Sequence, residues 1–312
     1  MNRLTAPLLV LLLLLVGCEP GDLATNPVRP DAARLSAACA AFNYADTLFF
    51  YREQATPYLE LPTTAQTGTY GAYPGGLVIN ATTGAINVNA SESGLKYRVW
   101  FVKTGATDTC SRFVTISGIN YLSKVYHLPA SDTLALPFYN AVRNLPPPCS
   151  DDDDDDDDDD EEDDDDDDDD DDDCEFDDGR DDDDGDGLGD EPPAGQEVIP
   201  QGIAINKQDG IINLRRTVAN GTFGATPVSG RTKTVRIYYR LNDASNKALN
   251  HIDVTLHWYA TLSEVPTALL AQLNDKRAAT LRRAVTPGLT LPQSPLLEIK
   301  RPRPPDIVLV GR

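Results

Sequence analysis

Short runs of apolar residues, separated by turn residues, recur along the first half of the chain. The run 48–51 and the partly alternating run Lys96–Val102 are typical of β-strands, and further short runs lie at 112–116 and 121–128. Strands about ten residues apart, with Gly, Asn and Pro between them, are typical of a β-sandwich. The pattern therefore predicts a β-sandwich domain over residues 36–145.

A second apolar pattern follows an acidic middle segment. Two strand-like runs, at 234–241 and 251–259, precede a segment in which leucines recur on one side. Because Pro266 is tolerated in the first turn of a helix, this segment predicts a helix over 266–285. Together these patterns predict a second β-rich domain, with an added helix, over residues 197–312.

The two predicted domains share a short repeat. The segments Gly76–Val88 and Gly202–Leu214 carry Gly, Ile-Asn, Gly and Ile-Asn at the same spacing. In each segment an Asn-x-x-x-Gly turn separates two short strands, and its Gly can adopt a positive φ at no steric cost. The spacing indicates an internal duplication. The alternative is that both segments follow the common pattern of a hairpin.

One stretch of the first domain resembles a known module. Residues 71–87 follow the pattern Pro-x-Gly-Leu-x-Ile-Asn-x-x-Thr-Gly-x-Ile, and residues 94–99 add a Gly and a Tyr-x-Val strand. This pattern resembles the immunoglobulin-like, cadherin-like modules of bacterial surface proteins. The resemblance implies an all-β fold with two Ig-like β-sandwich domains. It does not define a function, because such modules serve as spacers, adhesive units and accessory domains alike.

The middle of the chain is almost purely acidic. Every residue from 151 to 173 is Asp or Glu, and residues 151–191 contain 33 acidic residues and one arginine, a net charge of -32. Since the whole chain has a net charge of -23, the remainder sums to +9. The segment has almost no apolar surface to offset the loss of chain entropy, so it cannot form a packed core. We predict a disordered poly-Asp linker, within residues 146–196, that joins the two domains.

The looser end of this linker contains a candidate cation site. Four aspartates follow the pattern Asp-x-Asp-x-Asp-Gly-x-x-Asp: Asp182, Asp184, Asp186 and Asp190. Alternate carboxylates and a Gly at the turn supply the oxygen ligands that Ca²⁺ prefers. The pattern resembles thrombospondin type-3 and dockerin-like calcium loops, which implies calcium as the cofactor, whereas Pro193 at the twelfth position does not support an EF-hand. The alternatives are a chance match within an aspartate-rich tract, loose binding of divalent cations along its whole length, and a passive solubilising linker.

The N-terminus resembles a bacterial lipoprotein signal. An apolar run from Leu8 to Val16, too short for a stable membrane anchor, ends in Leu-Val-Gly-Cys at Cys18. The resemblance implies that residues 1–17 are a signal peptide and that Cys18 carries acyl chains such as palmitate. The Pro-rich, polar composition that follows predicts a tether over residues 18–35. Glu19 is not the Asp that usually retains such proteins at the inner membrane. We therefore expect a lipid-anchored protein of the outer membrane, on either of its faces.

Cysteine usage agrees with an oxidising compartment. Beyond the lipidation site the chain has an even number of cysteines: Cys39, Cys110, Cys149 and Cys174. Four cysteines allow three pairings, and we favour Cys39–Cys110 within the first domain and Cys149–Cys174 around the acidic run. The second bond would restrict the unfolded chain by ~3 kcal/mol.

Enzyme motifs are not found in the sequence. It contains no G-x-S-x-G, no H-E-x-x-H and no phosphate-binding Gly loop. His251, Asp253 and His257 share one face of a predicted strand and could hold a metal in a hydrolase, but solvated strand faces are rich in such residues. We expect a non-enzymatic cell-envelope lipoprotein with a display, adhesion or structural role and a cation-responsive acidic spacer.

The expected partners follow from this reading. They are the membrane, through the N-terminal lipid, divalent cations, and a surface polymer or protein; no nucleic acid is expected. The basic end of the predicted helix, around Lys276–Arg283, is expected to attract the acidic run. The alternative function is that of a glycan-binding accessory lipoprotein of an outer-membrane importer. Its sugar platform would consist of four tyrosines: Tyr70, Tyr73, Tyr238 and Tyr239.

Overall fold

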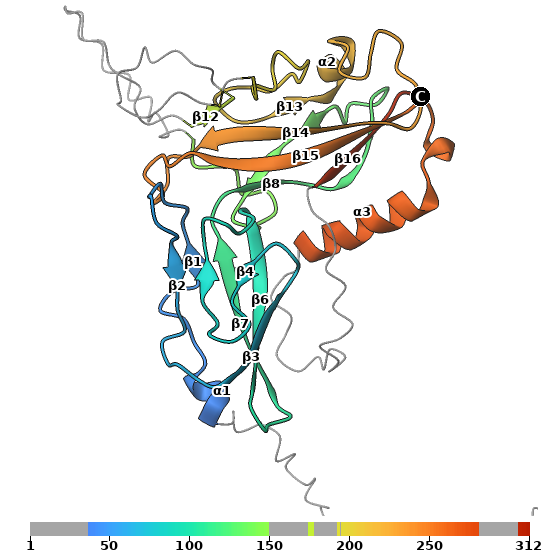
Figure 1. The fold of residues 1–312 in the computed structure, drawn as a ribbon. Coiled ribbons are helices and arrows are strands. Elements are labelled where there is room, and N and C mark those ends of the chain that lie inside the picture. The colour runs from blue at the N-terminus through green and yellow to red at the C-terminus, as the bar shows by residue number, and fades with distance from the viewer. Residues whose placement is uncertain (1–36, 150–173, 178–191, 194, 281–304) are drawn as a thin grey trace, which may run out of the picture. The chain divides into compact units, whose positions relative to one another are not determined.

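β-Strands dominate the computed structural model, which confirms the predicted all-β class (Figure 1). The structure describes residues 37–149, 174–177, 192–193, 195–280 and 305–312. All of these belong to one compact unit of the chain, Ala37–Arg312. No helix among them is long and apolar enough to cross a membrane.

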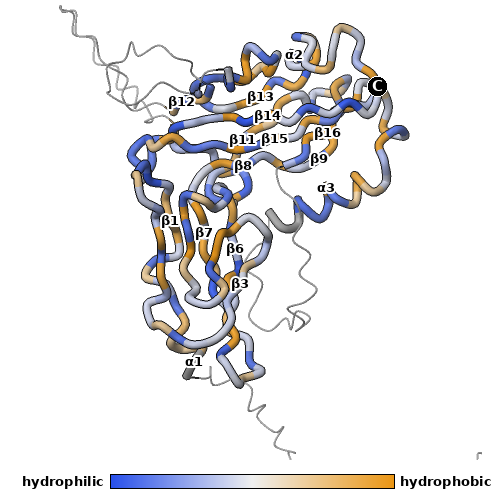
Figure 2. Tube along the Cα trace, viewed as in Figure 1, coloured by the Kyte–Doolittle hydropathy of each residue, from blue (hydrophilic) through white to orange (hydrophobic). Residues whose placement is uncertain are grey.

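The first hydrophobic core lies between two small sheets, and we call residues 37–116 the first β-unit. One sheet has the order β1-β7-β6-β3, with strands Leu48–Phe49, Thr109–Ile116, Leu95–Lys103 and Gly68–Tyr73. The other has the order β2-β5-β4, with strands Leu59–Glu60, Ile86–Asn87 and Val78–Ile79. Alternate residues of β6 are buried, as its partly alternating sequence predicts, and Figure 2 shows apolar positions recurring along these strands. The Cys39–Cys110 disulfide ties the short helix α1 (Ala37–Ala41) to β7.

The second core is built on a larger sheet, and we call residues 119–310 the second β-unit. The sheet has the order β12-β14-β15-β16-β9, with strands Glu175–Phe176, Arg231–Arg240, Asn250–Tyr259, Asp306–Val310 and Lys124–His127. Two short strand pairs complete the unit: β10 (Leu134–Ala135) with β13 (Ile212–Asn213), and β11 (Pro137–Tyr139) with β8 (Ile119–Tyr121). Its helices are α2 (Leu214–Ala219), the 3₁₀ turn η1 (Leu262–Glu264) and α3 (Thr267–Thr280).

The predicted hairpin repeat has the same hydrogen bonds in both β-units. The Gly84 N–H donates to the Asn80 carbonyl at 2.8 Å, and the Gly210 N–H donates to the Asn206 carbonyl at 3.0 Å. The two glycines have φ values of +74° and +70°, the left-handed region that favours Gly. In each turn the Asn side chain also accepts the N–H of the residue two positions on, Thr82 in one case and Gln208 in the other.

The repeat extends well beyond the hairpin. A tyrosine hydroxyl donates to the carbonyl of the turn glycine in both units, from Tyr44 at 2.7 Å and from Tyr121 at 2.6 Å. The strand pairs β2–β5 and β10–β13 also share one register, because Leu59 faces Asn87 and Leu134 faces Asn213. In the second unit, Tyr121 and Leu134 lie before the acidic run, whereas their partners Gly210 and Asn213 lie after it. One copy of the repeat is therefore built from both sides of the run.

The boundary between the units therefore differs from the sequence expectation. Residues 119–139 were expected in the first domain, yet Ile119, Tyr121 and Ala135 pack in the same buried cluster as Ile212. The acidic run consequently lies between β11 and β12 of the second β-unit, where we had expected a connection between two domains. The reason is physical: short strands such as β10 carry no local information about which distant strand they pair with.

The two units differ in how the last strand of the chain, β16, pairs. In the first unit β1 pairs directly with β7 in parallel. In the second unit β16 lies between β15 and β9 and pairs in parallel with both, and four of its five residues are fully buried. The predicted helix is present as α3, whose Leu269, Leu270 and Leu273 pack against this strand. Residues 281–285 of the prediction lie outside the described part.

Candidate functional site at the base of the acidic insertion

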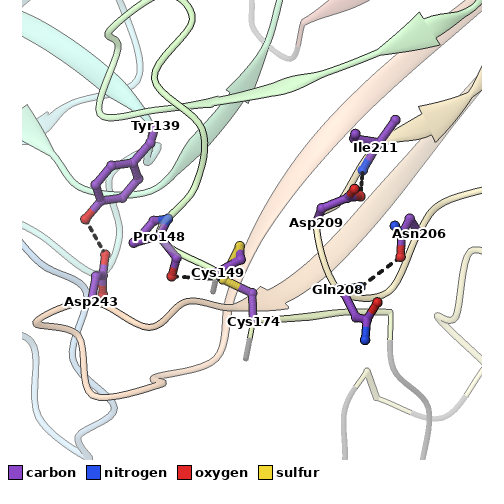
Figure 3. The surroundings of a disulfide bond; sticks show 9 residues. All are labelled: Tyr139, Pro148, Cys149, Cys174, Asn206, Gln208, Asp209, Ile211 and Asp243. Carbon is purple, nitrogen blue, oxygen red and sulfur yellow. Dashed lines mark hydrogen bonds between the residues drawn. A yellow bond between two sulfur atoms is a disulfide. The ribbon is translucent and has the colours of Figure 1, made fainter. Parts of the chain in front are cut away.

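A disulfide closes the acidic run at its base. Cys149 and Cys174 are bonded, with their Cα atoms 4.6 Å apart, so both ends of residues 150–173 start from the same place on the second β-unit (Figure 3). Together with Cys39–Cys110, this confirms both predicted pairings. The Pro148 carbonyl oxygen lies 3.4 Å from the Cys174 sulfur. The acidic run is therefore an insertion with closed ends in the folded unit.

The residue that anchors the far side of this base is Phe176. It lies in β12, paired with β14, and its ring is fully buried and stacked on Tyr239 with centroids 5.8 Å apart. The ring also covers the repeat turn, because a Cβ added at Gly210 would lie 2.4 Å from it. The sequence reading missed this anchor. Its signal was a lone aromatic residue inside an otherwise acidic stretch, next to a cysteine.

Asp177 bonds the acidic segment to the chain that follows it. Its buried carboxylate accepts the N–H groups of Val198, at 2.7 and 2.8 Å, and Ile199, at 2.8 Å. Burial raises the pKa of Asp177, and these hydrogen bonds oppose that rise. Asp177 is thus bonded to the segment at Val198 and Ile199, which follows the acidic stretch in the sequence. Asp177 has a structural role here, in contrast to the solvated role expected for the whole acidic segment.

A buried arginine lies beside this base. Arg240 at the end of β14 is 2% exposed, and its guanidinium lies 3.6 Å from the Glu175 carboxylate and 3.8 Å from that of Glu53. A buried guanidinium needs opposite charge nearby to offset its desolvation. Two acidic residues of the segment, Glu175 and Asp177, therefore belong to the fold.

The loop between β14 and β15 closes the site on one side. The Tyr139 hydroxyl donates to the Asp243 carboxylate at 2.7 Å (Figure 3). Ser117 donates to the same oxygen at 3.0 Å. Burial raises the pKa of Tyr139, with a further contribution from this carboxylate. These bonds hold the Asp243 loop beside the disulfide, so the base of the insertion is rigidly supported.

An apolar groove of about 630 Å³ borders the entry to the insertion. Leu134, Leu136 and Phe138 line it, together with Pro146 and Pro147, which directly precede the disulfide. The two leucines are exposed by 44% and 56%. Lys124 at its edge is paired with Asp132 at 2.8 Å, so one of the groove's basic groups is already neutralised.

The predicted lipidation and calcium residues lie outside the described part of the chain. These are Cys18, Asp182, Asp184, Asp186 and Asp190. Within the described part, no three His, Cys, Asp or Glu side chains come together as a metal site.

The histidine face of β15 does not form one site. Asp253 is held by Arg236 at 2.7 and 3.0 Å, and the His251 ring packs at a tilt against that of Tyr238, with centroids 5.7 Å apart. His257 instead contacts Asp306 of the neighbouring strand at 2.9 Å. Each member of the predicted set therefore has a separate partner.

The Asp306 carboxylate also holds the basic residue expected to attract the acidic run. Lys276 is 7% exposed and donates to Asp306 at 2.5 Å, with Gln272 donating at 3.0 Å. Burial raises the pKa of Asp306, but the hydrogen bonds from His257 and Lys276 outweigh it and lower the pKa below its usual value. Lys276 thus joins α3 to β16 through its ion pair with Asp306.

The predicted sugar platform of four tyrosines is not formed. Tyr70 and Tyr239 are 2% and 1% exposed and belong to different cores. Tyr73 and Tyr238 are half-buried, and the Tyr238 hydroxyl donates to Gln196. Adjacent residues of a strand point to opposite faces, which separates Tyr238 from Tyr239.

Sequence comparisons do not assign the chain to a family. No protein-family model matches the chain, and no curated protein matches it significantly.

Proposed function

We propose that the protein is a non-enzymatic, lipid-anchored protein of the bacterial outer membrane that displays a calcium-binding acidic insertion. Its two β-units would be Ig-like modules, attached to the membrane through Cys18 and the tether 18–35. The carrying observation is the base of the insertion. A disulfide with Cα atoms 4.6 Å apart presents the whole acidic run from one point of a folded β-unit.

The sheet orders support the Ig-like assignment. In an Ig-like sandwich two sheets face each other, and the strand pairs of each sheet come from distant parts of the sequence. The orders β1-β7-β6-β3 and β2-β5-β4 of the first unit follow such an arrangement. The shared hairpin and strand registers support the same arrangement in the second unit.

Charge density supports cation binding by the insertion. An extended chain advances ~3.3–3.6 Å per residue, close to the charge spacing of ~3.4 Å along one DNA strand. A line of carboxylates at this spacing gathers counterions, and divalent ions most strongly. Hard oxygen ligands favour Ca²⁺, with Asp182, Asp184, Asp186 and Asp190 as the candidate ordered ligands.

The proposal is tested by small-angle scattering of the lipid-free chain, residues 19–312, titrated with Ca²⁺ and with K⁺ at matched ionic strength. We expect a saturable contraction that is specific to Ca²⁺. A variant with every acidic residue of 151–173 changed to Asn or Gln has the same length and should not contract. Equal responses to both ions would reduce the effect to screening and refute calcium binding.

Two further experiments separate the parts of the proposal. Changing the four aspartates at 182, 184, 186 and 190 to Asn should abolish any high-affinity calorimetric phase and leave loose binding by the run intact. Membrane attachment is tested independently with Cys18→Ala, which should release the protein from the outer-membrane fraction. Retention of that variant in the membrane would contradict the lipid anchor.

A further inference from the structure

A polar cavity of about 240 Å³ lies apart from the acidic insertion. The loop around Glu92 and Ser93 forms one wall, and Pro305, just before β16, lines another part of the cavity. The starts of β8 and β15 contribute four polar residues: Asn120, Asn250, His251 and Asp253. No lysine or arginine is among its lining residues in the described part of the chain. Within that described lining, an anionic ligand would meet the carboxylates of Glu92 and Asp253 and no Lys or Arg side chain.

The walls of this cavity are held in place by their own hydrogen bonds. Ser93 Oγ and the Tyr239 hydroxyl are 2.8 Å apart in a buried contact. The Asp253 carboxylate is fixed by both nitrogen contacts of Arg236, and Asn250 Oδ1 accepts the His251 N–H at 2.8 Å. Next to Ser93, the Gly94 backbone packs so closely on Ile119 that an added Cβ would lie 2.0 Å from its carbonyl oxygen. The cavity is therefore preformed.

Asn120 is the unusual member of the lining. Its side chain is 2% exposed, and its Oδ1 has no hydrogen-bond partner among the described residues. A buried acceptor without a donor is costly, and such a group calls for an explanation in a native protein. A ligand hydroxyl that donates to Asn120 Oδ1 would satisfy it.

We propose that this cavity binds one neutral polyhydroxylated ring, a monosaccharide unit of a glycan. Carboxylates at Glu92 and Asp253 accept hydrogen bonds, whereas amide, hydroxyl and imidazole groups both donate and accept them. Sugar hydroxyls require this mixture, and the volume suits a single ring rather than a long chain. The inference goes beyond the proposed function, because it uses no residue of the acidic insertion.

The experiment measures binding of a panel of neutral monosaccharides and their glycans to the lipid-free chain, by saturation-transfer NMR and calorimetry in EDTA. EDTA removes calcium, so failure of the calcium proposal leaves this result unaffected. We expect at least one neutral sugar to bind, and Asn120→Leu to weaken it about tenfold or more, as loss of one hydrogen bond does. Asn274→Leu at an exposed position of α3 is the matched control and should bind normally.

A second variant keeps the test independent of core packing. His251 is exposed and lines the cavity, so His251→Ala should weaken sugar binding without lowering the melting temperature. Asn120→Leu removes a polar atom that has no partner, so it should also fold. The proposal is overturned if no neutral sugar binds, or if the affinity is the same in both variants as in the parent protein.

Discussion

Replacement of Phe176 tests whether the acidic segment is built into the second β-unit. Its ring is fully buried and stacked on Tyr239. Truncation of a buried Phe to Ala costs ~3–5 kcal/mol, whereas changes in a solvated connection stay within ~0.5 kcal/mol. Because the neighbouring disulfide still holds the chain in Phe176→Ala, we expect the lower end of the core range, a loss of ~3 kcal/mol in the free energy of unfolding.

The assay is urea denaturation followed by tryptophan fluorescence. The chain has two tryptophans, and Trp258 packs against the second core, so a Trp100→Phe background leaves one reporter in that unit. Phe113→Ala, at a half-buried position of the first β-unit, is the control and should lower the free energy of unfolding by less than Phe176→Ala, because its ring is less buried. A loss below ~0.5 kcal/mol for Phe176→Ala would refute the anchor and restore the linker interpretation.

Three further outcomes are expected. Serine at both Cys149 and Cys174 should lower the free energy of unfolding by ~3 kcal/mol, measured by urea denaturation, and an unchanged midpoint would contradict the closed base. Folding lowers the pKa of Asp306, so its ionised carboxylate stabilises the fold above the pKa of the unfolded chain, and this stabilisation is lost as pH falls through the pKa of the folded protein. In thermal melts, Asp306→Asn should therefore reduce the fall of melting temperature at acidic pH. Gly210→Ala should destabilise more than Gly221→Ala, because both have positive φ but only the first meets a ring, and equal melting temperatures would refute that contact.

The buried contacts at the base of the insertion have a consequence for function. Glu175, Phe176 and Asp177 form a short folded segment between the two most acidic parts of the sequence. Under the proposed function, cations that bind the acidic residues on either side would act on a segment that is fixed to the second β-unit.

Local features of the fold were predictable from the sequence alone. The alternation in Lys96–Val102 defined the central strand β6, and the Asn-x-x-x-Gly spacing defined two turns with equal hydrogen bonds. The two disulfides were also predicted correctly, because four cysteines allow few pairings and their flanking segments suggested partners. The leucine spacing predicted helix α3, which the structure describes from Thr267 to Thr280. Each of these signals lies within a short window of sequence.

Only the tertiary structure decided which strands share a core. Residues 119–139 and β12 join the second β-unit across the acidic run, and β16 enters between β15 and β9. These choices depend on backbone pairing between segments far apart in the chain, and strands of two or three residues carry too few side chains to specify a partner. The same holds for the cavity at Asn120, whose walls come from four separate parts of the sequence. Sequence periodicity reports which face of a strand is buried, while the identity of the neighbouring strand is set by packing.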